Sequence, residues 1–167
     1  VTVEATQGTT TRKAIVSVVL EPGPLAQVRT VPERVEVRVT ETRQLAAFAQ
    51  DMYGNEIPGA KITWRAEGSG SIDASGRFVA GTRAGDFPDA VRATTEVSGI
   101  RREATVSLTI KPGAVKTVAV HGDSARIYTG DSVRFTAEGF DEFGNPVEPK
   151  SLAWSSTQGA VDRLARS

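Results

Sequence analysis

One motif occurs twice in the chain at a distance of 90 residues, and this repeat constrains the fold more than any other feature. Asp-Met-Tyr-Gly-Asn at residues 51–55 precedes Trp64, and Asp-Glu-Phe-Gly-Asn at residues 141–145 precedes Trp154. Both the motifs and the tryptophans are separated by the same interval, since 141 − 51 = 90 and 154 − 64 = 90. A fixed period indicates a duplicated structural unit. A unit of this size can bury a core of its own.

A second repeated landmark gives the boundaries of the units. Leu-Glu-Pro-Gly at residues 20–23 recurs as Ile-Lys-Pro-Gly at residues 110–113, again 90 positions later. Each Pro-Gly follows a segment in which apolar and polar residues alternate, and proline cannot donate a hydrogen bond to a sheet, so Pro-Gly should end a strand and a unit. We therefore expect the last hairpin of a preceding module at 1–22, a complete module at 23–112, and the first part of a following module at 113–167.

The alternation pattern predicts an all-β chain. Between the two Pro-Gly pairs we expect about seven short strands separated by turn residues, with a hairpin tip near Ser98-Gly99 and no helical period. This number and spacing of strands is typical of an antiparallel β-sandwich. The expected strands lie near residues 26–31, 34–40, 43–50, 60–66, 70–79 (interrupted by a turn at 74–76), 89–97 and 101–111.

The two flanking segments are expected to be partial copies. Residues 3–6 resemble 91–94 at an offset of 88, which places a length difference in the hairpin loop, and residues 159–162 resemble 70–73 at an offset of 89. The chain starts with valine and stops within a repeat, so we expect it to be an excerpt of a longer protein. The last module would then lack its final hairpin, which predicts an uncovered inner face and a poorly folded C-terminal third.

The order of these motifs resembles the bacterial immunoglobulin-like (Big) repeats of invasin- and intimin-type adhesins and other bacterial surface proteins. D-x-[YF]-G-N is followed by I-x-W or L-x-W, by G-x-[IV]-D, and by the run at 76–85 and a V-x-A-T strand. The resemblance implies tandem immunoglobulin-like antiparallel β-sandwiches that act as extracellular stalks or adhesive tips, without catalytic residues. The chain lacks the cysteine pair of antibody domains, and no tyrosine occupies the position of a tyrosine corner.

Alternation and the repeat together predict the core. Trp64 and Trp154 could in principle stack on sugar rings, but a tryptophan on a central strand next to an inward isoleucine favours a core position. The residues expected in the core are Leu45, Ile62, Trp64, Val91, Val106, Leu108, Phe135 and Trp154.

The loops at 51–55 and 141–145 carry the candidate binding residues. Asp51, Asn55, Asp141 and Asn145 could be calcium ligands, because carboxylate and amide oxygens suit a hard cation. The alternative is a tight turn, in which aspartate caps its own backbone and glycine tolerates positive φ. Two ligands per loop fall short of the six to eight that calcium takes, which favours the turn and no metal. The aromatic residue in the middle of each loop either packs on the end of the sandwich or is exposed at a tip or joint.

Composition and the remaining motifs argue against other functions. Lys+Arg and Asp+Glu both number 20, which leaves no basic stripe for nucleic acid, and no apolar run is long enough to cross a membrane. There is no cysteine for disulfides or thiol chemistry, and the single histidine, His121, has no nucleophile motif. Arg12-Lys13 and Arg101-Arg102 could form a recurring basic tip for an anionic polymer, although an ordinary solvated face is the simpler interpretation.

The sequence therefore predicts a non-catalytic segment without a cofactor, which acts as a spacer, stalk or adhesive part of a bacterial cell-surface or secreted protein. Neighbouring modules of the same chain are the expected partners, with a host receptor or a polysaccharide as further possibilities. The alternative is an accessory module of a secreted polysaccharide-active enzyme. Extracellular location is expected under both interpretations.

Overall fold

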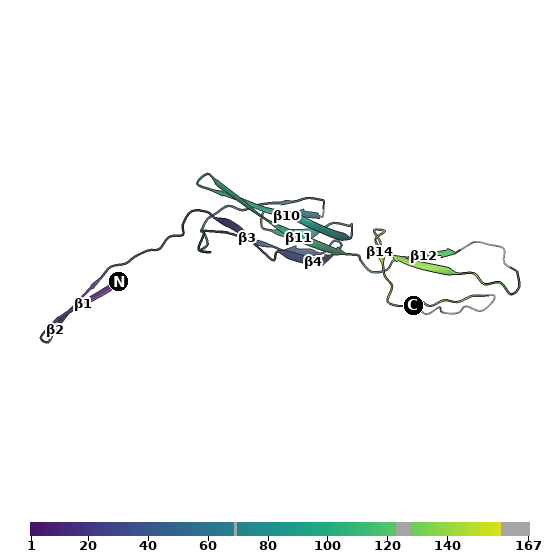
Figure 1. The fold of residues 1–167 in the computed structure, drawn as a ribbon, viewed down its shortest axis with the longest axis horizontal. Helices are drawn as coiled ribbons and strands as arrows, with labels where there is room; N and C mark the ends of the chain where they lie inside the picture. Colours follow the sequence, from purple (N-terminus) through teal and green to yellow (C-terminus); the bar gives the residue numbers. More distant parts are fainter. Residues whose placement is uncertain (69, 123–127, 158–167) are drawn as a thin grey trace.

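The computed structural model describes residues 1–68, 70–122 and 128–157, and all regular elements in these ranges are β-strands. They form three parts in a row along the longest axis (Figure 1). The N-terminal hairpin is β1 (Thr2–Gln7) and β2 (Thr10–Ile15), the central segment is residues 23–112, and the C-terminal segment starts at residue 113. No helix in the described ranges is long and apolar enough to span a bilayer.

The central segment holds three small sheets. One has the strand order β4-β11-β10-β7, the second pairs β3 with β6, and the third has the order β5-β9-β8. The strands are β3 (Gln27–Val31), β4 (Arg34–Arg38), β5 (Thr42–Gln44), β6 (Ala46–Gln50), β7 (Thr63–Ala66), β8 (Gly70–Ile72), β9 (Arg77–Ala80), β10 (Gly85–Val97) and β11 (Ile100–Lys111).

Alternation within these strands produces the core between the sheets. In β3 and β4 every second residue is buried, and the inward residues of β11 are buried in the same way, so one face of each strand supplies the core. Of the predicted core residues of this segment, Leu45, Val91, Val106 and Leu108 are fully buried. Trp64 is half-buried and packs against the core cluster, and Ile62 is half-buried just before β7.

Two features of the central segment differ from the expected pattern. The strand expected at 43–50 is split at Leu45, because its first half pairs with β9 and its second half with β3. In addition, β4 pairs with β11 in parallel, whereas the other strand pairs of the described residues are antiparallel. The hairpin tip at Ser98-Gly99 is where the sequence placed it, with positive φ at both residues as a two-residue hairpin turn requires.

The 90-residue period is preserved in the strand register of the flanking segments. β1 and β2 pair Val3 with Ala14, just as β10 and β11 pair Ala93 with Ala104. Val3 is therefore the counterpart of Ala93, and the offset of 88 expected for this hairpin is wrong. Residues 3–6 resemble 91–94 in sequence, but they pair as residues 93–96 do. The two positions are easily confused, because a shift of two keeps the same face of a strand inward.

The C-terminal segment repeats the first part of the central one. Its strands are β12 (Thr117–Gly122), β13 (Phe135–Phe140) and β14 (Pro146–Val147). Thr117 pairs with Phe140 as Gln27 pairs with Gln50, again 90 positions apart. The expected match at 159–162 lies outside the described residues.

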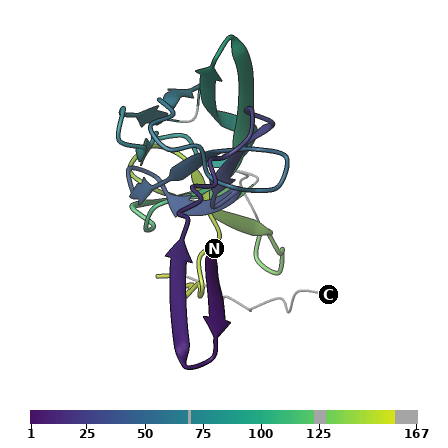
Figure 2. The same cartoon turned by 90° about the vertical axis from the view of Figure 1, so that its left-hand side faces the viewer.

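Burial in the C-terminal segment differs from the expectation at one predicted core residue. Phe135 is 55% exposed, although its counterpart Leu45 is 1% exposed. In the central segment β10 and β11 supply the opposite face of the core, and the described part of the C-terminal segment has no such hairpin. Trp154, in contrast, is half-buried like Trp64. The two strands of the N-terminal hairpin are exposed along their whole length, and Figure 2 shows this hairpin standing clear of the central strands.

Candidate functional site: the Asp-to-Asn loops and the joint between segments

The loop at residues 51–55 is organised around the carboxylate of Asp51. Its Oδ1 accepts hydrogen bonds from the backbone N–H of Tyr53 at 2.8 Å and of Asn55 at 2.9 Å. The carbonyl of Asp51 accepts a bond from the N–H of Gly54, which has a φ of 84°. A residue other than glycine rarely adopts this conformation, so the sequence Asp-x-x-Gly-Asn directly produces a closed turn.

The second oxygen of Asp51 reaches outside the loop. Oδ2 accepts a bond from the backbone N–H of Gly23 at 2.9 Å and another from Nδ2 of Asn55 at 2.9 Å. Gly23 is the first residue of the central segment and belongs to the Pro-Gly linker at its boundary, 28 residues before Asp51. The aspartate therefore fastens the Pro-Gly linker to the end of the sandwich.

The second loop repeats this arrangement atom for atom. Oδ1 of Asp141 accepts bonds from the N–H groups of Phe143 and Asn145, both at 2.9 Å. Oδ2 accepts a bond from the N–H of Gly113 at 2.8 Å and one from Nδ2 of Asn145 at 2.8 Å. In both copies one carboxylate therefore accepts four hydrogen bonds, three from its own loop and one from the linker glycine.

These bonds keep both aspartates ionised. The pKa of Asp51 falls from its ordinary value of 3.8 to about 2, chiefly because of the bond from the Asn55 side chain and then that from the Gly23 N–H. At Asp141 burial acts first and raises the pKa. The bonds from Gly113 and Asn145 outweigh this effect and hold the pKa at about 2.

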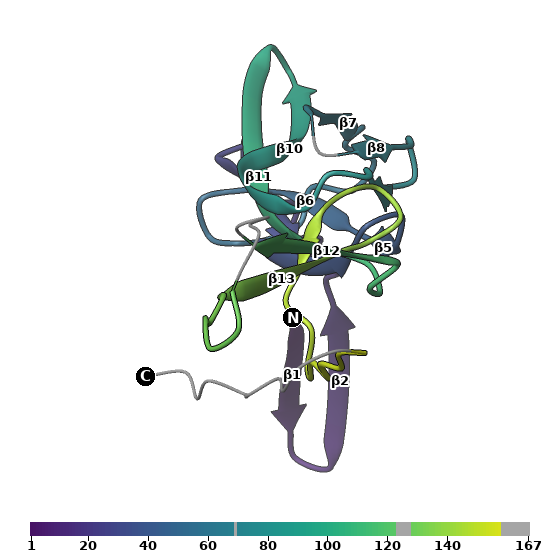
Figure 3. The same ribbon diagram turned by 90° about the vertical axis from the view of Figure 1, so that its right-hand side faces the viewer.

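The amide of Asn145 also joins the C-terminal segment to the central one. Its Oδ1 accepts a bond from the N–H of Ala84 at 2.8 Å, and its Nδ2 donates to the carbonyl of Thr82 at 2.7 Å. Thr82 and Ala84 lie in the loop between β9 and β10. The C-terminal segment follows the central one along the long axis, as Figure 1 shows from the side and Figure 3 from the C-terminal end. We call this contact of Asn145 with residues 82–84 the joint.

The joint makes the two loops different despite their common internal geometry. Asn145 is 8% exposed because the loop at 82–84 covers it, whereas Asn55 is exposed. Tyr53 is 79% exposed and its counterpart Phe143 is 40% exposed. Asn55 donates to Asp51, but its Oδ1 has no hydrogen-bond partner among the residues that the structure describes. One copy of the motif is therefore engaged with a neighbouring segment and the other is open.

The geometry of the loops bears directly on the calcium alternative. Each carboxylate oxygen of Asp51 and Asp141 already accepts two N–H hydrogen bonds, which occupies the positions that a cation would need. The side chains of Asn55 and Asn145 donate to these carboxylates through nitrogen. Within the described ranges no three acidic or histidine side chains gather in a way that could hold a metal ion.

The remaining candidate residues lie apart from the joint. His121, on β12, faces Glu138 at 3.7 Å on an exposed surface. The basic pairs near the hairpin tips are engaged individually: Arg102 donates to the carbonyl of Ala26 at 2.9 Å, and Lys13 pairs with Glu4 at 2.5 Å.

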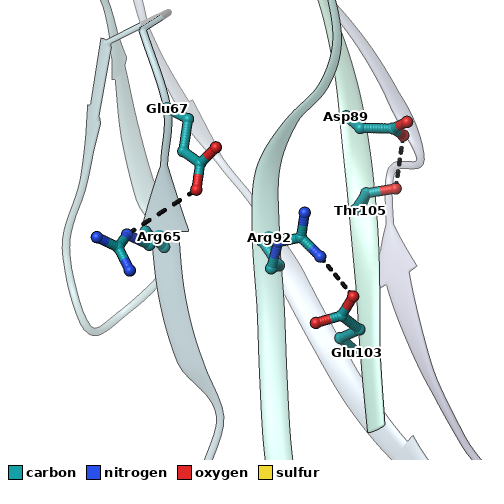
Figure 4. Close-up of polar contacts among 6 residues, drawn as sticks. All are labelled: Arg65, Glu67, Asp89, Arg92, Glu103 and Thr105. Carbon is teal, nitrogen blue, oxygen red and sulfur yellow. Dashed lines mark hydrogen bonds and ion pairs between the residues drawn. The ribbon is translucent and has the colours of Figure 1, made fainter.

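The outward face of β7, β10 and β11 carries charges of both signs, as Figure 4 shows. Arg92 pairs with Glu103 across the hairpin, and Thr105 donates to Asp89 at 2.7 Å. Arg65 on β7 and Glu67 just after this strand form a looser pair, at 4.0 Å. Because the two ion pairs are exposed and each joins opposite charges, this face has the character of a solvated sheet surface.

Reasoning from the sequence identified the loops but missed two of their contacts. The sequence predicted that the aspartate caps the backbone of its own turn, but it did not predict the bond to the linker glycine. A signal for that bond was present, because both copies keep the same spacing between the linker glycine and the aspartate (51 − 23 = 28 and 141 − 113 = 28). The contact of Asn145 with residues 82–84 has no comparable signal, since it joins two different units.

Several solved bacterial surface proteins are similar to this chain. FdeC, an Escherichia coli adhesin, is 19% identical over 72% of this chain and 41% of its own, with a TM-score of 0.42. Domains 1–6 of the surface layer protein SbsC are 17% identical over 87% of this chain and 20% of their own, with a TM-score of 0.42. InvD of Yersinia pseudotuberculosis is 22% identical over 77% of this chain and 45% of its own, with a TM-score of 0.45.

The chain spans less than half the length of each of these structures, and likeness at this level assigns it neither a partner nor a role. No protein-family model matches the sequence, and no curated protein matches it. The chain is all-β over its described residues and resembles the bacterial immunoglobulin-like repeats, and solved structures similar to it include bacterial surface proteins.

Proposed function

We propose that this chain is a spacer segment of a bacterial surface or secreted protein, in which residues 23–112 form one module and residues 113–167 begin the next. Its function is to fix the direction in which one module follows another. The observation that carries this proposal is the joint, where Asn145 bonds to the backbone of Thr82 and Ala84.

The chemistry of the joint suits a spacer. A Pro-Gly pair alone would let successive modules swivel, because glycine has the largest backbone freedom. The carboxylate of Asp141 removes part of this freedom by binding the N–H of Gly113, and Asn145 then ties the same loop to the preceding sandwich. These two contacts of one loop, with the linker and with the preceding sandwich, act together as a clamp. Nearest-neighbour contacts of this kind govern the shape of tandem repeats.

The location at the cell surface and the absence of catalysis belong to the same proposal. They are supported by the resemblance of the ordered motifs to bacterial immunoglobulin-like repeats. They also agree with the outward face of β7, β10 and β11, whose charges pair with one another. Protease treatment of intact producing cells should remove this segment, and a hydrolytic activity abolished by a substitution in residues 23–112 would contradict the proposal.

The spacer function can be tested by measuring the distance between the two segments. The chain contains no cysteine, so a pair of cysteines for spin labels can be introduced at exposed strand positions, Thr63 on β7 and Thr136 on β13. Double electron–electron resonance should give a single narrow distribution of the distance between the two spin labels. The substitution Asn145→Ala should broaden it, because the two bonds to residues 82–84 are lost.

Asn55→Ala is the matched control, since it removes the same kind of side chain from the equivalent loop at 51–55 without touching the joint. It should leave the distribution narrow. A broad distribution in the unsubstituted chain, or equal widths for the chain and for Asn145→Ala, would show that the joint does not fix the direction of the modules.

A further inference from the structure

The open face of the first loop is the second place where a module could be held. Asn55 stands at the same position in its loop as Asn145, and both side chains donate to the carboxylate of their aspartate at nearly the same distance, 2.9 and 2.8 Å. The groups that Asn145 uses at the joint are its Oδ1 and the second hydrogen on its Nδ2. On Asn55 no described residue bonds to these two groups.

The aromatic residue beside Asn55 is also more exposed than its counterpart beside Asn145. Met52 and Tyr53 are 76% and 79% exposed. Side by side, these two side chains form an exposed apolar surface at one end of the sandwich. At the corresponding position of the second loop Phe143 is 40% exposed. The first loop thus presents an apolar surface next to an amide with a free donor and a free acceptor.

We propose that the loop at 51–55 is a docking site for a module placed upstream, and that Asn55 binds the backbone of that module's loop equivalent to residues 82–84. The inference rests on the proposed spacer function, and extends it from one joint to a joint that repeats along an array. The partner is a copy of the same sandwich, and the contact has the same hydrogen bonds as the joint at Asn145.

The joint at Asn145 also defines what the partner must supply. The two groups that bond to Asn145 belong to the backbone: the carbonyl of Thr82 and the N–H of Ala84, two residues later. Recognition by a backbone carbonyl and N–H depends on the shape of the loop and not on its side chains. An upstream module therefore needs the same turn between its counterparts of β9 and β10, while the residues in that turn can vary.

A lengthened chain provides the test, with residues 1–112 followed directly by residues 23–167. The splice replaces Pro112-Gly113 by Pro112-Gly23, so it keeps the Pro-Gly pair found at both natural positions. The lengthened chain has two copies of the central segment. In it, the second copy of Asn55 should face the first copy of Ala84, and Asn145 should face the second copy of Ala84.

The readout is the hydrogen-exchange rate of the two Ala84 N–H groups, distinguished by isotope labelling of one copy at a time. Both should exchange slowly. Asn55→Ala in the second copy should speed exchange at the first Ala84 by about tenfold or more, since an N–H that loses its only acceptor becomes accessible. Asn55→Ala in the first copy is the matched control and should change neither rate. Asn55→Gln in the second copy, which keeps the amide but moves it by one methylene, should give an intermediate acceleration of exchange.

The outcomes separate this inference from the proposed function. If Asn145→Ala speeds exchange at the second Ala84 but Asn55→Ala in the second copy leaves the first Ala84 unchanged, the docking site at 51–55 is refuted and the spacer function stands. If neither substitution changes exchange at the Ala84 that it faces, both proposals fail. If Asn55→Ala unfolds the copy that carries it, the first-copy control will also show fast exchange at the first Ala84, and the Asn55→Gln variant of each copy is then compared in the same way.

Discussion

The central and C-terminal segments share a 90-residue register, yet they differ in what is buried. At equivalent positions Val28 is 8% exposed and Val118 is 53% exposed, while Leu45 and Phe135 are 1% and 55% exposed. The aspartates of the two loops, in contrast, are buried alike. The same sequence pattern therefore gives the same loop in both segments but not the same core.

The difference follows from the range of the interactions. An Asp-to-Asn loop is completed by hydrogen bonds within five residues and by one linker N–H, so it forms wherever those residues are present. The core needs apolar side chains from strands that are distant in the sequence. In the central segment Val91, Val106 and Leu108 supply them, and the described part of the C-terminal segment has no counterpart of β10 and β11. The joint stays intact because it depends on loops and not on the core.

The largest effect is expected from removing one core side chain in each segment. Leu45→Ala should lower the free energy of unfolding by about 2–5 kcal/mol, because it leaves a cavity in a closed core. Phe135→Ala, at the equivalent position, should cost less than about 1 kcal/mol, because this side chain is already largely in water. Urea unfolding of each variant measures both values. Equal losses would show that the C-terminal segment has a closed core after all.

Hydrogen exchange should show the same contrast in unsubstituted protein. We expect the amides of β12 and β13 to exchange at least about 100-fold faster than those of β3 and β6, since their strand pairs lack a covered face. Paired amides such as those of Val118 and Val28 allow a direct comparison at equal register. Uniform protection across residues 115–157 in a monomer would contradict this expectation.

The next effect concerns the carboxylate that both segments share. Asp51→Asn keeps the size of the side chain but replaces one acceptor oxygen by a donor group, so it cannot accept all four bonds from the loop and the linker. We expect the melting temperature of the central segment to fall by roughly 5–10 °C. Calorimetry measures this change, and Asp86→Asn, on the exposed side of β10, is a control that should shift it by less than about 2 °C.

Acid should reduce the same stabilisation. Because the pKa of Asp51 is about 2 in the folded chain and 3.8 ordinarily, its ionised form is favoured by folding. The contribution is complete above about pH 4 and is lost as the pH falls toward 2. Asp73, whose pKa is lowered chiefly by the hydroxyl of Ser75, acts in the same direction. The urea midpoint should fall between pH 4 and pH 2, and it should fall less in Asp51→Asn. If the urea midpoint of Asp51→Asn fell with pH as much as that of the unsubstituted chain, the role of the carboxylate would be contradicted.

Much of the fold could be predicted because its signals are local and repeated. The alternation in β3, β4, β10 and β11, the Pro-Gly ends and the turn at Ser98-Gly99 each depend on neighbouring residues. The split of one strand at Leu45 and the parallel pairing of β4 with β11 could not be predicted in this way, because both depend on which strand lies alongside.

The candidate site shows the same limit. A turn at Asp51 and Asp141 was predictable from Asp-x-x-Gly-Asn, and the constant spacing to the linker glycine would have supported the bond to that glycine. The partner of Asn145 was not predictable, because residues 82–84 carry no pattern that marks them as an acceptor surface. The exposure of Phe135 was missed for a similar reason. The alternation places this residue on an inward face, but it does not say whether another sheet covers that face.

The most direct test of the joint is whether the two segments tumble as one body. Residual dipolar couplings measured for the central segment and for β12–β14 should fit one common alignment tensor, because the linker clamp and Asn145 hold the segments together. In Asn145→Ala the two segments should require different tensors, with a smaller one for the C-terminal segment. Two different tensors in the unsubstituted chain would contradict the claim that the Asp-to-Asn loop sets the direction of the next segment.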